Sequence, residues 1–145
     1  MKNYINNPQA IEKRSFEIIG EELGSIHFPE ETDSIVRRVI HTTADFEYAR
    51  LIEFKNDAVN SGLKALAAGK KIYADTMMIK SAVNSRAMAM QGVEMVNYVH
   101  DEDVRAEAKE RGVTRSTVAM EKAIKNGDIG IFAIGNAPTA LYRSS

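Results

Sequence analysis

One segment of the sequence gathers side chains that could move a proton and attract an anion. Residues 37–45 read Arg-Arg-Val-Ile-His-Thr-Thr-Ala-Asp. Histidine titrates near neutral pH, so His41 could both donate and accept a proton at working pH. Arg37 and Arg38 would attract an anionic ligand. Asp45, four residues after His41, could orient the imidazole if the helix continues that far. On spacing alone, a helical histidine beside Arg and Asp is more often an ordinary surface or core side chain.

A turn near the end of the sequence could bind the same kind of ligand. Residues 135–139 read Gly-Asn-Ala-Pro-Thr and follow an apolar stretch. Backbone N–H groups at the start of a helix bind anions, and ligands of open parallel sheets lie beyond the carboxyl ends of the strands. The segment is neither a P-loop nor a Gly-x-Gly-x-x-Gly fingerprint, and an ordinary capped turn explains it equally well.

Two further polar segments stand where elements are expected to end or begin. Asp75-Thr76 closes an expected strand and Thr114-Arg115-Ser116 opens an expected helix, and each alone is typical of helix capping. Together, the expected turns and helix starts supply hydroxyls, amides and guanidinium groups. That inventory suits a large ligand that carries many carboxylates.

The elements that must position these groups alternate between helices and strands. Apolar residues three and four apart, with Pro near the starts and Gly near the ends, predict helices over 8–24, from 29 to about 41, and over 57–69, 101–112 and 114–127. Short β-like runs predict strands over 71–75, 95–99 and 129–134. Strands separated by helices favour an α/β fold with a parallel sheet and right-handed crossovers.

Composition excludes several classes of protein. The chain has 145 residues, with 44% hydrophobic and 27% charged residues, which fits one domain over residues 1–145 with a packed core. Its net charge of -1 gives no general attraction to nucleic acid or to an anionic membrane. Without cysteine there is no disulfide and no thiolate metal site, and His27 and His100 form no ligand spacing with His41. No signal peptide or bilayer-spanning run is visible, so we expect a soluble, cytoplasmic protein.

Five ordered motifs give the sequence a resemblance that covers essentially the whole chain. It resembles the precorrin-8X methylmutase (precorrin isomerase) family of corrin-ring biosynthesis. The segments that carry the resemblance are Ile11-x-x-x-Ser15-Phe16-x-Ile18-Ile19, Arg37-Arg38-Val39-Ile40-His41-x-Thr43-Ala44-Asp45, Asp75-Thr76-x-Met78, Thr114-Arg115-Ser116 and Gly135-Asn136-Ala137-Pro138-Thr139-Ala140. The resemblance implies a parallel sheet flanked by helices on both faces, an α/β/α sandwich, assembled as a homodimer or a larger oligomer.

The resemblance also implies an activity and a set of residues. In that family a methyl group moves between neighbouring ring carbons of the tetrapyrrole, and precorrin-8X becomes hydrogenobyrinic acid, or the cobalt-containing equivalent reacts. His41 matches the proposed proton donor and acceptor, and Ser15 and Arg38 match positions that contact the substrate. Arg115, Asn136 and Thr139 are further partners for the acidic side chains of the substrate. The reaction requires no metal and no organic cofactor.

One departure keeps other functions open. Members of the family continue beyond the Gly-Asn-Ala-Pro-Thr-Ala-Leu stretch, whereas this sequence stops at Ser145, so we expect a C-terminally shortened domain. A sheet that lacks late strands would expose an edge through which copies could associate. The first alternative is a non-catalytic corrinoid-binding or scaffold protein. The second is a small nucleotide-binding α/β domain, which only the turn at Gly135 favours.

Overall fold

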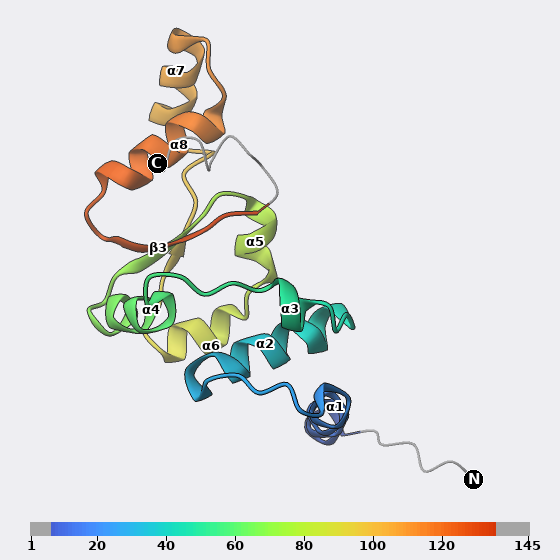
Figure 1. Ribbon diagram of the computed structural model, residues 1–145. Coiled ribbons are helices and arrows are strands. Elements are labelled where there is room, and N and C mark those ends of the chain that lie inside the picture. The colour runs from blue at the N-terminus through green and yellow to red at the C-terminus, as the bar shows by residue number, and fades with distance from the viewer. Residues whose placement is uncertain (1–6, 136–145) are drawn as a thin grey trace. The chain divides into compact units, whose positions relative to one another are not determined.

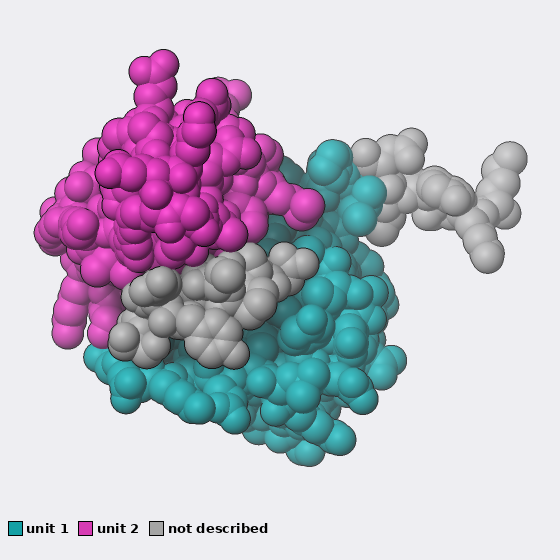
Figure 2. Space-filling view, turned by 90° about the horizontal axis from the view of Figure 1, so that it is seen from above, with its two compact units in different colours: residues 1–59 teal, residues 60–145 magenta. Residues whose placement is uncertain are grey.

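The computed structural model describes residues 7–135 of the chain. They belong to two compact units, residues 1–59 and residues 60–145, which Figure 2 colours separately. Each unit has its own cluster of buried apolar side chains. The single domain expected over residues 1–145 stays a prediction. In residues 7–135, no helix combines the length and the apolar character needed to cross a bilayer.

The first unit consists of helices. They are α1 (Pro8–Leu23), α2 (Glu30–Thr43) and the short α3 (Tyr48–Leu51). The Asn7 side chain caps α1 by accepting a hydrogen bond of 2.9 Å from the Gln9 backbone N–H, and Gly24 ends the helix with a φ of 55°. Both bounds of α1 agree with the prediction, because the capping chemistry is local in sequence.

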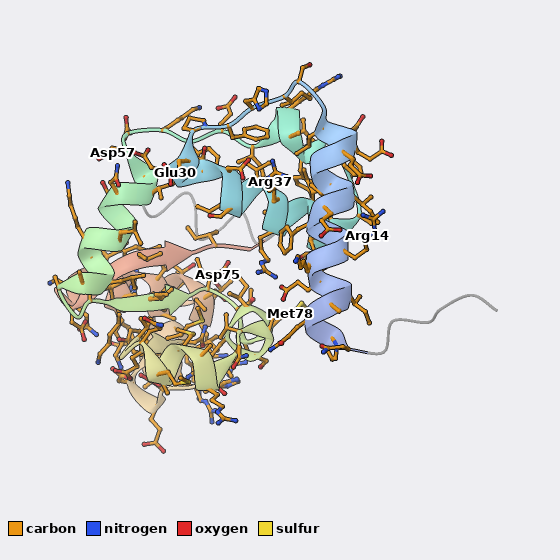
Figure 3. All side chains as sticks on the ribbon, turned by 90° about the horizontal axis from the view of Figure 1, so that it is seen from below. Arg14, Glu30, Arg37, Asp57, Asp75 and Met78 are labelled. Carbon is orange, nitrogen blue, oxygen red and sulfur yellow. The ribbon has the colours of Figure 1, made fainter. Side chains whose placement is uncertain are left out.

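The core of this unit forms where α1 and α2 pack together, as Figure 3 shows. Ile19 and Leu23 of α1 and Val36 and Ile40 of α2 are each four residues apart, so each pair lies on one face of its helix. All four side chains are buried, with Phe16, Phe28, Tyr48, Ala49 and Ile52 packed around them. Burying that face of α2 brings the following residue, His41, against α1 at the rim of the core.

The second unit carries a three-stranded sheet. Its elements are α4 (Ala58–Ala67), which begins two residues before the division between the units, β1 (Lys71–Ala74), α5 (Met77–Ala82), α6 (Ser85–Met90), β2 (Met95–Val96), α7 (Glu102–Arg111), α8 (Arg115–Lys125) and β3 (Ile129–Ala133). The strand order is β2-β1-β3, and both pairings are parallel. The predicted parallel α/β sheet is therefore confirmed.

Helices cover both faces of this sheet (Figure 1). On one face, Tyr73 of β1 packs with Met120 and Ala123 of α8. On the other face, α4 approaches β3 so closely that a Cβ placed on Gly62 would lie 3.7 Å from Ile131 Cδ1. Residues 73 and 131 belong to opposite faces because Ile131 pairs with Ile72, and neighbouring residues of a strand point to opposite sides. The flanking of the sheet by helices on both faces is as predicted.

Several short elements differ from the sequence-based prediction. α3, α5 and α6 were not predicted, because four to six residues are too few to show a helical period. The strand predicted over 95–99 ends at Val96. Asn97 leaves the ladder there: its side chain donates to the Ala74 carbonyl at 2.6 Å and accepts from the Val99 N–H at 3.0 Å.

An extra residue in β3 fixes how that strand meets β1. Lys71 pairs with Ile129 and Ile72 pairs with Ile131, which leaves Gly130 as an unpaired bulge. A Cβ on Gly130 would lie 2.6 Å from Lys70 Cβ and 2.7 Å from Ala65 Cβ. Only glycine fits this position without moving the end of α4.

We predict that Gly130→Ala lowers the free energy of unfolding by about 1–3 kcal/mol, because the new methyl group overlaps two neighbouring Cβ atoms. Urea denaturation followed by circular dichroism measures the change. Gly127→Ala is the matched control, since a Cβ there would meet nothing within 4 Å. Equal stability of the two variants would contradict the bulge assignment.

Candidate functional site

The candidate site begins with a hydrogen bond between the two packed helices of the first unit. Ser15 Oγ of α1 lies 2.8 Å from His41 Nδ1 of α2. Both residues are half-buried, so their side chains lie at the edge of the core. A hydroxyl group both donates and accepts, so Ser15 can pair with the neutral and with the protonated imidazole. The bond to Nδ1 leaves Nε2 as the ring nitrogen that can exchange a proton with a ligand.

An aromatic ring packs against the same imidazole. The rings of Phe16 and His41 are nearly parallel, with centroids 5.3 Å apart and an interplanar angle of 17°. The guanidinium carbon of Arg38 lies 4.9 Å from the centroid of the same Phe16 ring, a cation–π distance. Two consecutive residues of α1 therefore contact two ionisable residues of α2 that are one helical turn apart.

The cation at this site is held by a carboxylate and remains open to solvent. Arg38 donates a hydrogen bond to Glu12 Oε1, and 58% of the Arg38 side chain is exposed. The hydrogen bond and the positive charge of Arg38 lower the pKa of Glu12, and the charge of His41 acts in the same direction. Part of the Arg38 guanidinium group is open to a further carboxylate, but Glu12 already binds it.

The geometry corrects the expected role of Asp45. The helix ends at Thr43, and Ala44 takes the left-handed conformation with a φ of 56°. Beyond that break, Asp45 Oδ1 accepts a hydrogen bond of 2.8 Å from the Glu47 N–H. The condition for an i, i+4 contact with His41 is not met, and Ser15 is the partner of the ring instead.

Arg37 also has a different setting from the one expected. Its Nε donates to Asp33 Oδ2 at 2.7 Å within α2, and only 26% of its side chain is exposed. Its Nη1 lies 3.1 Å from where a Cβ on Gly20 would be, so this glycine makes room for the guanidinium group between the helices. Figure 3 labels Arg37 on α2. Arg37 serves the packing of α1 and α2 rather than an open anion site.

The other predicted substrate-binding residues are either in the second unit or outside the described residues. Arg115 is the first residue of α8 in the second unit and is exposed. The preceding Thr114 caps that helix by accepting a hydrogen bond of 3.2 Å from the Thr117 N–H. Asn136 and Thr139 lie outside the described residues. The structure thus brings together Ser15, Arg38 and His41, and places Arg115 in the second unit.

From the sequence, Asp75 and Thr76 are expected only to cap a helix. The capping is done by Thr76, whose Oγ1 accepts from the Ile79 N–H at 3.2 Å. Asp75, only 7% exposed, instead accepts a hydrogen bond of 3.0 Å from the Gly135 N–H through Oδ1. Burial, and then the charge of Asp75, raise the pKa of Tyr73 to about 12. Asp75 therefore joins the end of β1 to the first residue of the Gly135–Thr139 segment. The sequence feature that could have indicated this role is a carboxylate placed directly after a buried strand.

The second carboxylate oxygen of Asp75, Oδ2, is buried and accepts no hydrogen bond within residues 7–135. The same residues contain no group of three His, Cys, Asp or Glu side chains that could hold a metal ion.

The fold agrees with the comparisons with known proteins. A family model described as precorrin-8X methylmutase matches residues 10–144. The chain belongs to the precorrin-8X methylmutase family, which the five ordered motifs predicted. A cobalt-precorrin-8 methylmutase of Priestia megaterium is 49% identical over 134 residues, which are 92% of this chain and 60% of that relative. One of Salmonella typhimurium is 40% identical over 97% of this chain and 70% of that relative.

Solved structures extend the agreement to three dimensions. The precorrin-8X methylmutase of Thermus thermophilus superposes with a TM-score of 0.83 at 40% identity, covering 94% of this chain and 66% of that one. This confirms the predicted fold class. The chain spans 60% of the Priestia relative and 65% of a cobalt-precorrin-8 methylmutase of Leptospira interrogans.

We predict that the Glu12–Arg38 pair makes a pH-dependent contribution to stability. The pKa of Glu12 is below its ordinary value of 4.5, so the pair stabilises the fold above that pH, and the contribution disappears as the pH falls through the lowered pKa. Glu12→Gln should therefore be less stable than the unsubstituted chain at neutral pH and equally stable in acid. Urea denaturation at both pH values measures this. High salt should shrink the difference, since the pair is exposed. Glu22→Gln removes the same charge from the same helix as a control, and an equal loss there would refute the prediction.

A second prediction concerns the link between β1 and β3. Asp75→Ala removes the acceptor of the Gly135 N–H and should lower the free energy of unfolding by about 1–3 kcal/mol. It should also speed hydrogen exchange at the Gly135 amide. Asp75→Asn keeps a side-chain carbonyl at the same position, so exchange at Gly135 should stay slow in that variant. Fast exchange at Gly135 in the unsubstituted chain would disprove the link.

Proposed function

We propose that this chain provides the proton-transferring site of a methylmutase of cobalamin biosynthesis. The substrate would be precorrin-8X, or its cobalt-containing equivalent, and the product hydrogenobyrinic acid or cobyrinic acid. The observation that supports this most directly is the Ser15–His41 hydrogen bond with Arg38 beside it, in a member of the precorrin-8X methylmutase family. The curated relatives quoted above are named cobalt-precorrin-8 methylmutases.

The proposed reaction needs one acid and no co-reactant. The protonated imidazole of His41 gives its proton from Nε2 to the conjugated macrocycle, which makes the ring system electron-poor. The bond between the methyl group and its ring carbon breaks while the bond to the neighbouring carbon forms. The proton then returns to His41, so atoms and electrons balance and the enzyme is unchanged.

The neighbours of His41 have separate roles in this proposal. Ser15 accepts from Nδ1–H in the protonated ring and still accepts from it after Nε2 has given up its proton, so one contact holds the imidazole through the cycle. Arg38 offers an exposed guanidinium group for a substrate carboxylate. Arg115, Asn136 and Thr139 remain predicted partners for other carboxylates, and the homodimer or larger oligomer also remains a prediction.

A second candidate function rests on the same exposed guanidinium group and the same hydrogen-bonded imidazole. A chain that binds the corrinoid without converting it would use the same Arg38 and the same Ser15–His41 pair. The two functions differ in turnover and not in ligand class.

We predict that His41→Ala abolishes turnover of precorrin-8X, with a loss of about 10²–10⁴-fold, because the proton donor is removed. Binding of hydrogenobyrinic acid, followed by its visible absorption spectrum, should weaken only a few-fold. His27→Ala removes an exposed histidine of the same unit and serves as the control. Full activity in His41→Ala would exclude the proposed role. Ligand binding without turnover in the unsubstituted chain would favour the non-catalytic function.

A further inference from the structure

The ring of Phe16 touches both ionisable residues of α2 that the proposed function uses. Its centroid lies 5.3 Å from the centroid of the His41 ring and 4.9 Å from the guanidinium carbon of Arg38. Phe16 is also half-buried and packs against the core cluster of Ile19, Leu23, Val36 and Ile40. Its position therefore serves two ends, packing and contact with the site.

Two consecutive residues of α1 restrain different motions of the imidazole. The Ser15 bond restrains the imidazole at one edge, through Nδ1. The near-parallel stacking on Phe16 restrains the tilt of the ring plane, because a large rotation about χ2 would break the stacked contact. Together the edge contact and the face contact define where Nε2 points.

The ring also acts on the charge of His41. The face of a benzene ring carries negative electrostatic potential and attracts a cation, so stacking favours the imidazolium form over neutral imidazole. The other charged groups near His41 in this unit oppose each other in part. Arg38 repels the imidazolium, whereas Glu12, bound to Arg38, attracts it. The carboxylate of Asp45, beyond the end of α2, accepts from the Glu47 N–H.

We propose that Phe16 is a positioning residue of the proton-transfer site, which fixes the orientation of the His41 imidazole and stabilises its protonated form. The inference rests on the proposed function for its catalytic meaning. The stacked geometry itself can be tested without substrate. Phe28 provides the comparison, because it packs half-buried against the same core cluster from the loop between α1 and α2.

The test follows the protonation of the His41 ring by NMR, assigned by the resonance that is lost in His41→Ala. In Phe16→Leu, the midpoint of the His41 titration should fall by about 0.4–0.7 pH units, the shift equivalent to one exposed cation–π contact. Phe16→Tyr keeps an aromatic face and should restore most of the midpoint. Phe28→Leu loses comparable packing and should leave it unchanged. An unchanged midpoint in Phe16→Leu, or an equal fall in Phe28→Leu, would overturn the proposal.

The rate of turnover separates this inference from the proposed function. If His41 in its protonated form is the acid, then the alkaline limb of the pH–rate profile should move to lower pH in Phe16→Leu by the same amount as the titration. If the titration midpoint of His41 moves but the pH–rate profile does not, the stacking role of Phe16 is supported. That outcome would contradict the role of His41 as the acid. If neither the titration midpoint nor the rate profile moves in Phe16→Leu, the proposed role of Phe16 is refuted.

Discussion

The packing of α1 against α2 is the constraint on which the candidate site depends. Burial of Ile19, Leu23, Val36 and Ile40 fixes the two helices in one register. Apolar burial of this kind stabilises by about 1.5–3 kcal/mol for each large side chain. In that register Ser15 meets His41 at 2.8 Å, with Phe16 beside it. The contacts of the candidate site at the rim are short-range and weak individually, so their geometry is set by the core beneath them and not by the contacts themselves.

The fold could be predicted wherever the signal was local or periodic. Asn7, Pro8 and Gly24 carry the caps of α1 in their own chemistry, and the apolar run at Ile129–Ala133 is a strand. The short helices α5 and α6 could not be predicted, because each begins with a single polar cap and then has too few residues for a pattern. The bulge at Gly130 depends on the approach of α4, which sequence spacing does not contain.

The candidate site could be predicted in its residues but not in its connections. His41, Ser15 and Arg38 were identified from motifs, and the structure brings them together. The partner of the imidazole was expected from the same segment, at Asp45, yet it comes from residue 15 of another helix. Contacts such as Ser15–His41 and Asp75–Gly135 join residues 26 and 60 positions apart, which only the packed chain reveals.

The bond between Glu12 and Arg38 has a consequence for how any acidic ligand would be recognised. Arg38 is already neutralised, so an incoming carboxylate gains only the difference between its own pairing and the one it replaces. Recognition at this point is then an exchange of anions, in which Glu12 competes with weak or singly charged ligands. A ligand that bears several carboxylates can displace it by engaging other groups at the same time.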